Sequence, residues 1–126
     1  TMGAKVAFCA PSPLIPYQAH NWDVKLMYDV DDAIQWADVI MLLRIQMERQ
    51  QANFFPSLRE YHNYFGITRE RLDRSKKEIT IMHPGPINRG IEIESTLADS
   101  NYSVILNQVT NGVAVRMAVL YLLSGE

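Results

Sequence analysis

Residues 79–89 read ITIMHPGPINR, a short apolar run that leads directly into a turn with two prolines. Residues 79–82 are apolar or β-branched, which is typical of a buried strand. Pro84 and Pro86 fix their own φ angles and carry no backbone N–H. The turn therefore presents carbonyl oxygens with few amide hydrogens to compete for them, which suits an amide or carbamoyl NH2 ligand. A rigid turn that only ends the strand explains the same residues equally well, and Gly85–Pro86 is a candidate cis peptide in either case.

The chain has the size and composition of one globular domain. It has 126 residues, of which 48% are apolar and 21% are charged, and its net charge is −2. This charge gives no reason to expect nucleic acid or an anionic membrane as a partner. The single cysteine, Cys9, excludes an internal disulfide and a multi-cysteine zinc site, which points to a reducing compartment such as the cytoplasm. The apolar runs are too short to span a bilayer.

Strand and helix patterns alternate along the first two-thirds of the sequence. Strands are expected at residues 5–10, 24–28, 38–43 and 79–82, and helices at 31–36 and from 68 to about 77. Residues 38–43 do not alternate in polarity, so both faces of that strand should be covered, as in a parallel sheet. This order predicts an α/β fold with a doubly wound, mainly parallel sheet in three layers.

Arg44 and Gln46 follow the strand predicted at residues 38–43. In open α/β sheets ligands bind outside the carboxyl ends of the strands, and the turn His83–Pro86 lies at another such end. The guanidinium of Arg44 suits a carboxylate, and Gln46 can add an amide donor on the same side if the backbone is extended. The alternative is a surface salt bridge between Arg44 and Glu48. After the turn, Arg89 and Glu92 are candidates to brace it.

Two later segments have less regular patterns. Residues 50–66 are rich in aromatic side chains and form either a mobile lid or a short helix at 57–64. His20 and His62 lack metal-ligand spacing and are expected to be solvated loop residues.

Residues 102–123 should form a helix that is apolar nearly all round, which indicates burial on two sides. Either a partner surface is missing, or this is a central core helix.

Four segments together resemble the catalytic chain of the aspartate carbamoyltransferase family. They are residues 39–49 (VIMLLRIQMER), 55–61 (FPSLREY), 82–93 (MHPGPINRGIEI) and 108–118 (QVTNGVAVRMA). They stand in the family's order, and the similarity extends over nearly the whole chain. The resemblance implies transfer of the carbamoyl group of carbamoyl phosphate to L-aspartate, in pyrimidine biosynthesis, without a metal or other cofactor.

The resemblance also implies roles for particular residues. Arg44 would hold an aspartate carboxylate with help from Gln46, and Glu48 would orient Arg44. Arg49 would bridge two domains on closure. The carbonyl groups of Pro84 and Gly85 would receive the carbamoyl NH2, with His83 in support. The bond between Gly85 and Pro86 would be cis, and Pro86 would be the third residue of this carbamoyl phosphate site.

The same resemblance implies that residues 1–126 are the aspartate-binding domain, incomplete at its N-terminal end. The family's phosphate motif, active-site lysine loop and His-x-x-Gln motif do not occur in these residues. The helix at 102–123 would pack on the absent carbamoyl-phosphate domain, and the isolated chain would be inactive. A complete enzyme would be a homotrimer, with or without regulatory or dihydroorotase chains.

Two alternative functions stay open. One is an ornithine-type enzyme, in which cysteine is expected after His83, and the other is a non-catalytic scaffold or allosteric partner.

Overall fold

The structure, a computed structural model, describes residues 3–46 and 57–125. Its strands are β1 (Ala7–Cys9), β2 (Lys25–Met27), β3 (Val39–Met41) and β4 (Thr80–Met82). Its helices are α1 (Val30–Trp36), α2 (Leu58–Phe65), α3 (Arg69–Ser75), α4 (Ser95–Ala98) and α5 (Ile105–Leu123), with 3-10 turns at Ser12–Leu14 and Tyr17–Asn21. The predicted strands are all present with shorter bounds, the predicted helices are present within a few residues of their expected bounds, and α4 is an addition.

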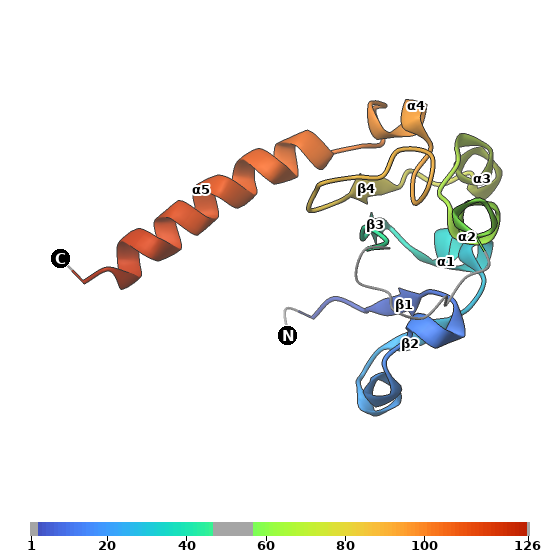
Figure 1. The fold of residues 1–126 in the computed structure, drawn as a ribbon, viewed down its shortest axis with the longest axis horizontal. Coiled ribbons are helices and arrows are strands. Elements are labelled where there is room, and N and C mark those ends of the chain that lie inside the picture. Colours follow the sequence, from blue (N-terminus) through green and yellow to red (C-terminus); the bar gives the residue numbers. More distant parts are fainter. Residues whose placement is uncertain (1–2, 47–56, 126) are drawn as a thin grey trace.

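The four strands form two parallel pairs. β1 pairs with β2, and β3 pairs with β4 in the register Val39–Thr80, Ile40–Ile81 and Met41–Met82. Helical connections link strands that run in the same direction, so the predicted α/β class is confirmed. In the described part of the chain the strands make two separate sheets rather than one continuous sheet (Figure 1).

Three helices begin at a polar residue whose side chain accepts a backbone hydrogen bond. Asp29 caps α1, with its Oδ1 2.8 Å from the amide nitrogen of Asp31. Ser57 caps α2 and Thr68 caps α3 in the same way. Such side chains satisfy amide groups that have no partner inside the helix, so they fix where each helix starts.

The hydrophobic core lies between β4 and the helices gathered at one end of the strands (Figure 1). Its buried members come from α1, α3, β4, α4, the start of α5 and the connecting loops; they are Val30, Ile34, Ile67, Leu72, Ile79, Ile81, Ile93, Leu97, Ala98 and Ile105. The core therefore packs against β4, the strand that leads into the turn at residues 83–86.

β3 differs from the expectation that both its faces are covered. Val39 and Met41 are exposed, whereas Ile40 between them is half-buried against the core. The prediction was wrong for this chain because only one face of the pair β3–β4 packs on described residues.

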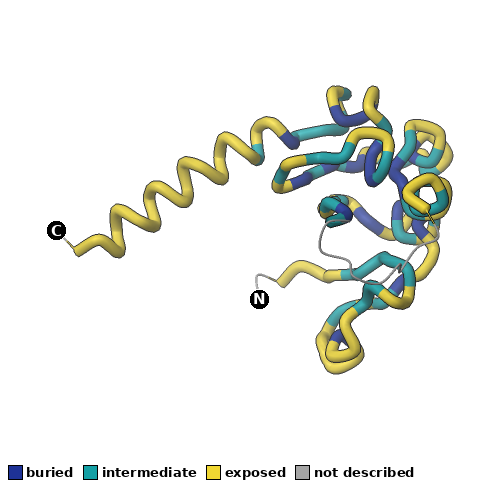
Figure 2. Tube along the Cα trace, in the orientation of Figure 1, coloured by how far each residue is buried: buried dark blue, intermediate teal, exposed yellow. Residues whose placement is uncertain are grey.

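α5 leaves the rest of the molecule as a single projecting helix (Figure 1, Figure 2). Ile105 at its first position is buried, but Leu106 is 76% exposed and Leu122 is 77% exposed. The alternative of a central core helix is therefore wrong. An apolar helix that nothing in the described chain covers agrees with the expectation of a missing partner surface.

The junction between α2 and α3 is tightly packed around Gly66. The carbonyl oxygens of Gly66 and Asn63 each accept a hydrogen bond of 2.7 Å from the guanidinium of Arg71. His62 Nδ1 lies 3.0 Å from the carbonyl oxygen of Ile91, so His62 is a half-buried helical residue and the prediction of a solvated loop histidine was wrong. A Cβ at Gly66 would lie 2.6 Å from the His62 carbonyl oxygen and 3.0 Å from that of Ile91.

We expect Gly66→Ala to lower the free energy of unfolding by about 1–3 kcal/mol, because the new methyl group meets backbone atoms that cannot move independently. Gly112→Ala is the matched control. Its Cβ meets nothing within 4 Å on α5, so alanine should leave stability unchanged or raise it by about 0.5–1 kcal/mol. Urea denaturation of both variants measures the difference. Equal stability for Gly66→Ala and the unsubstituted protein would contradict the packing described.

Candidate active site

The pairing of β3 with β4 brings the two predicted site segments to one edge. The two strands are parallel neighbours, and the Leu42 amide continues the ladder with a hydrogen bond of 2.9 Å to the Met82 carbonyl oxygen. The segment with Arg44 and Gln46 follows β3, and the turn His83–Pro86 follows β4. Both therefore leave the sheet at the carboxyl ends of adjacent strands, which is the usual position of a ligand site.

The turn after β4 uses its own N–H groups inside the protein. The His83 amide donates to Gln108 Oε1 at 2.8 Å, and the Gly85 amide donates to His83 Nδ1 at 2.9 Å. Pro84 and Pro86 have no N–H to offer. No described residue donates a hydrogen bond to the carbonyl oxygens of residues 84–86, which leaves acceptors for a ligand with N–H groups.

The predicted cis peptide between Gly85 and Pro86 is confirmed. Gly85 has a φ of 73°, a left-handed conformation that glycine adopts without a steric penalty. A Cβ there would lie 3.6 Å from Cγ2 of Val109, so the turn packs against the first part of α5. α5 supports the turn a second time through Gln108, whose Nε2 also lies 3.6 Å from the sulfur of Met41 on β3.

His83 is a neutral histidine with a defined tautomer. Its side chain is completely buried, and burial lowers the pKa of His83 below its ordinary value, against the opposing effect of Glu92. Because Nδ1 accepts the Gly85 N–H, the ring proton is assigned to Nε2. Nε2 lies 3.4 Å from Oε1 of Glu92, itself 1% exposed. His83 therefore supports the turn from inside and does not reach the surface.

The segment after β3 is held in place by the loop after the turn. Ile45 is buried, whereas Arg44 and Gln46 on either side of it are half-buried. The carbonyl oxygen of Ile45 accepts a hydrogen bond of 3.1 Å from Asn88 Nδ2. This bond joins the segment after β3 to the loop that directly follows the turn, and the alternation in burial agrees with Arg44 and Gln46 sharing one side.

Two of the predicted supporting residues, Glu48 and Arg49, lie outside the described residues, as do positions 50–56 of the expected lid. The alternative salt bridge between Arg44 and Glu48 is therefore also outside them. Residues 57–66 of the same segment form α2 and its end, as the helical alternative predicted.

Sequence reasoning missed two residues of this site and misplaced a third. Gln108 and Asn88 were given no role, although a polar amide at the start of an apolar helix and another just after Pro86 are the signals that could have found them. Arg89 was expected to brace the turn together with Glu92. Instead its guanidinium pairs with Asp99, at 2.6 and 2.8 Å, and reaches the Ser95 carbonyl oxygen.

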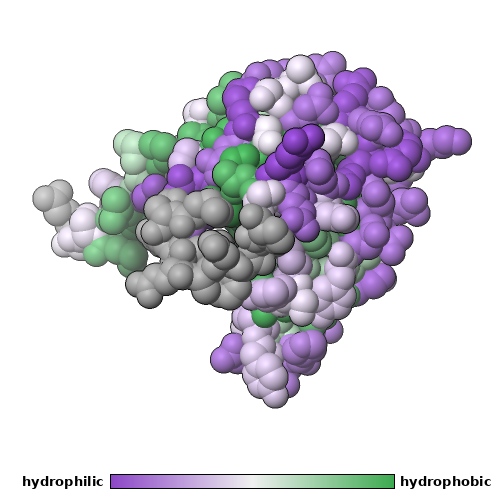
Figure 3. All heavy atoms as spheres, turned by 45° about the vertical axis from the view of Figure 1, so that its right-hand side comes forward, coloured by the Kyte–Doolittle hydropathy of each residue, from purple (hydrophilic) through white to green (hydrophobic). Residues whose placement is uncertain are grey.

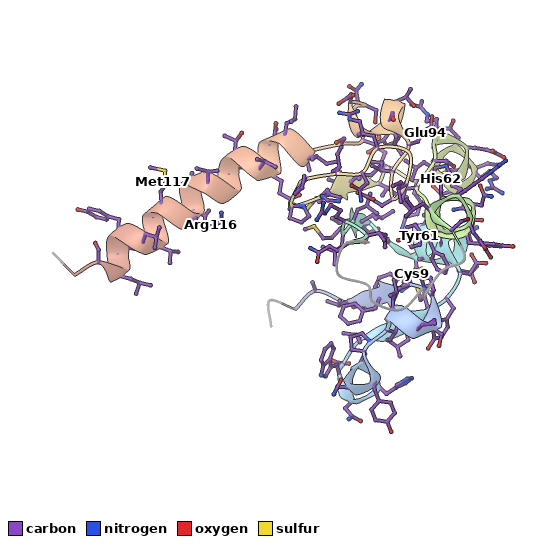
Figure 4. The ribbon with its side chains drawn as sticks, in the orientation of Figure 1. Cys9, Tyr61, His62, Glu94, Arg116 and Met117 are labelled. Carbon is purple, nitrogen blue, oxygen red and sulfur yellow. The ribbon has the colours of Figure 1, made fainter. Side chains whose placement is uncertain are left out.

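Cys9 and Tyr61 are unsuited to proton transfer or nucleophilic attack at neutral pH (Figure 4). Burial raises the pKa of the Cys9 thiol to about 11, with a smaller contribution from Asp29. Burial also raises the pKa of Tyr61 to about 12. Since the thiolate is the reactive form of cysteine, burial disfavours Cys9 as a nucleophile.

The rest of the described chain offers few other sites. An open depression of about 460 Å3 at the end of β2 is lined by Lys25, Leu26, Met27, Tyr28, Asp29 and Asp32, none of them a predicted site residue. Among residues 3–46 and 57–125, no three histidine, cysteine or acidic side chains gather as metal ligands would. No helix in those ranges is long and apolar enough to cross a membrane.

Comparison with known proteins gives relatives along nearly the whole chain. The aspartate carbamoyltransferase catalytic subunit of Cytophaga hutchinsonii is 58% identical over 124 residues, which are 98% of this chain and 40% of the relative. That of Syntrophobacter fumaroxidans is 57% identical over 122 residues, 97% of this chain and 40% of the relative. The chain thus spans about 40% of the length of these relatives.

Solved structures share the fold. Ornithine carbamoyltransferase from Pyrococcus furiosus aligns with a TM-score of 0.75 and 25% identity, over 94% of this chain and 41% of that one. The catalytic subunit of M. jannaschii aspartate transcarbamoylase aligns with a TM-score of 0.68 and 30% identity, over 92% and 39%. The family profile described as "Aspartate/ornithine carbamoyltransferase, Asp/Orn binding domain" matches residues 2–123, and the chain belongs to this family.

Proposed function

We propose that this chain is the aspartate-binding domain of an aspartate carbamoyltransferase catalytic chain. In the complete enzyme it takes part in forming N-carbamoyl-L-aspartate and phosphate from carbamoyl phosphate and L-aspartate, a step of pyrimidine biosynthesis. The observation that carries the proposal is the parallel pairing of β3 and β4, which puts the segment with Arg44 and Gln46 beside a turn rich in carbonyl groups. Relatives named for this enzyme support it.

Each segment recognises a different part of the reactants. Arg44 binds a carboxylate of aspartate through its planar guanidinium, and Gln46 adds an amide donor. The carbonyl oxygens of Pro84 and Gly85 accept hydrogen bonds from the carbamoyl NH2, Pro86 shapes the turn through its cis bond, and His83 holds the turn from inside. Glu48 orients Arg44, and Arg49 bridges to a neighbouring domain on closure.

Catalysis then consists of positioning and of stabilising charge. The α-amine of aspartate attacks the carbamoyl carbon and a C–N bond forms. The C–O bond to phosphate breaks as phosphate leaves with the bonding electrons, and the proton that the amine loses passes to the departing phosphate. Holding the two reactants together converts an encounter in solution into a reaction within one complex. The groups that neutralise the departing phosphate are expected on the carbamoyl-phosphate domain of the complete chain.

α5 is the surface that we expect to meet that domain. Met117 and Arg116 project from different sides of α5, with no other described element beside them (Figure 4), and Met117 is 66% exposed. Exposed apolar side chains gather on α5, whereas the surface at the other end of the molecule, around α2, α3 and α4, is mainly hydrophilic (Figure 3). An apolar surface of this kind favours association with another surface. A homotrimer of complete catalytic chains in the cytoplasm, with or without regulatory or dihydroorotase chains, completes the proposal.

The two alternatives have less support. An ornithine-type enzyme is expected to carry cysteine after His83, where this chain has Pro84, and to lack the pair Arg44 and Gln46. A non-catalytic scaffold would have lost ligand residues, whereas this chain retains both segments. Carbamoylation assays with aspartate and with ornithine as acceptors separate the three functions.

Arg44→Ala in the complete catalytic chain should weaken the use of aspartate by about 2–5 kcal/mol in transition-state binding, because a desolvated carboxylate loses its charged partner. Binding of carbamoyl phosphate should change little. Initial rates measured with each substrate varied in turn separate the two effects. An unchanged dependence on aspartate concentration would show that Arg44 does not hold this substrate.

The 126-residue chain alone should produce no measurable carbamoyl-aspartate, because the residues expected to bind the phosphate are not part of it. Adding the carbamoyl-phosphate domain as a separate polypeptide should restore activity if α5 is the contact between them. The matched control replaces Leu106 and Val113, both exposed on α5, with aspartate, which should prevent this restoration. Turnover by the isolated chain would contradict a site divided between two domains.

A further inference from the structure

Glu92 is a buried acidic residue to which the proposed reaction gives no role. Its side chain is 1% exposed, and its backbone carbonyl oxygen accepts a hydrogen bond of 3.0 Å from the Ile67 amide. Its carboxylate Oε1 lies 2.5 Å from the Asn88 amide nitrogen and 3.4 Å from Nε2 of His83. One oxygen atom therefore faces two residues that belong to different parts of the site.

The first of these residues leads to the turn. The carboxylate lies beside the Nε2 side of the His83 ring, whereas Nδ1 on the opposite side accepts the Gly85 N–H at 2.9 Å. The ring is thus held between Glu92 and the backbone of the turn. Any rotation of the ring would break the bond to Gly85 and move the neighbouring carbonyl groups.

The second residue leads to the segment after β3. The Asn88 backbone is fixed by its bond to Glu92, and the Asn88 side chain donates to the Ile45 carbonyl oxygen at 3.1 Å. Ile45 lies between Arg44 and Gln46, so its position sets where both side chains begin.

Burying a carboxylate is costly unless hydrogen bonds compensate for the loss of water. An apolar side chain of similar size would fill the same volume without that cost. The presence of an acid at this point therefore calls for an explanation in its contacts: the hydrogen bond from the Asn88 amide and the approach of His83 Nε2 to 3.4 Å lead to both halves of the site.

We infer that Glu92 is a positioning residue that sets the carbonyl turn and the Arg44–Gln46 segment relative to each other, through His83 on one side and Asn88 on the other. This inference rests on the proposed function, since it assigns the two segments to the two substrates. Glu92 itself touches neither substrate.

The test uses the complete catalytic chain and the KM of each substrate. Glu92→Leu, which removes both contacts, should raise KM for aspartate and for carbamoyl phosphate by about tenfold or more, since small misplacements of binding groups are costly. Asn88→Ala, which breaks only the link to Ile45, should raise KM for aspartate alone. Glu94→Gln is the matched control: its exposed carboxylate contacts Arg69 and Thr96, and both KM values should stay within about twofold.

A second pair of measurements does not depend on the folding of Glu92→Leu. The 15N chemical shifts of His83 should show an unprotonated Nδ1 and a protonated Nε2, and Glu92→Gln, which keeps an oxygen for the Asn88 amide, should restore both KM values to within about threefold. Protonation of Nδ1, a rise in only one KM for a folded Glu92→Leu, or equal effects of Asn88→Ala on both substrates would overturn the inference.

Failure of the proposed function is recognised separately. If the unsubstituted chain does not carbamoylate aspartate, or if Arg44→Ala leaves the use of aspartate unchanged, the assignment of the segments to substrates is wrong. If those two measurements agree with the proposal and Glu92→Leu behaves like Glu94→Gln, only the positioning role is wrong.

Discussion

Parallel hydrogen bonding between β3 and β4 brings together the two described segments of the candidate site. The ladder from Val39–Thr80 to Met41–Met82, extended by Leu42, aligns the ends of the two strands. Without that register, Arg44 and the turn at His83 would be two unrelated loops. Because parallel strands expose their carboxyl ends at one edge, a single backbone interaction places a cationic group and a set of carbonyl acceptors together.

Side-chain contacts then refine what the strands place. Gln108 on α5 binds the His83 amide, and Asn88 binds the carbonyl oxygen of Ile45. Both are neutral amides, which can donate and accept in a partly buried site without the desolvation cost of a charge. Glu92 is the buried acid among these polar groups, and it contacts the two residues through which the halves of the site are connected.

α5 links the site to the surface that we expect to be an interface. Its first turns support the His-Pro-Gly-Pro turn, and the rest of the helix extends away with its apolar residues exposed. Docking of another domain along α5 would therefore act on the same helix that holds His83.

Local sequence was enough to predict the strand before His83, the turn and the positions of Arg44 and Gln46, because these depend on short-range signals such as β-branched runs and prolines. It could not predict which faces are buried. Residues 38–43 and 105–123 are apolar enough to be covered on all sides. Their actual exposure depends on which other parts of the protein pack against them, and their own sequence does not specify this. The ion-pair partner of Arg89 could not be predicted either. Asp99 and Glu92 are both near Arg89 in sequence, and only the tertiary fold selects Asp99. Contacts such as Gln108 with His83, 25 residues apart, require the fold as well.

The most direct measurement is a crystal structure of the complete catalytic chain with N-carbamoyl-L-aspartate and phosphate bound. A carboxylate of the product should lie within hydrogen-bond distance of the Arg44 guanidinium, and its carbamoyl NH2 should donate to the carbonyl oxygens of the turn at residues 84–86. The carboxyl ends of β3 and β4 would then enclose the product from two sides. A product molecule bound elsewhere, or one that contacts Arg44 but leaves these carbonyl oxygens to water, would contradict the claim that the paired strands form this half of the active site.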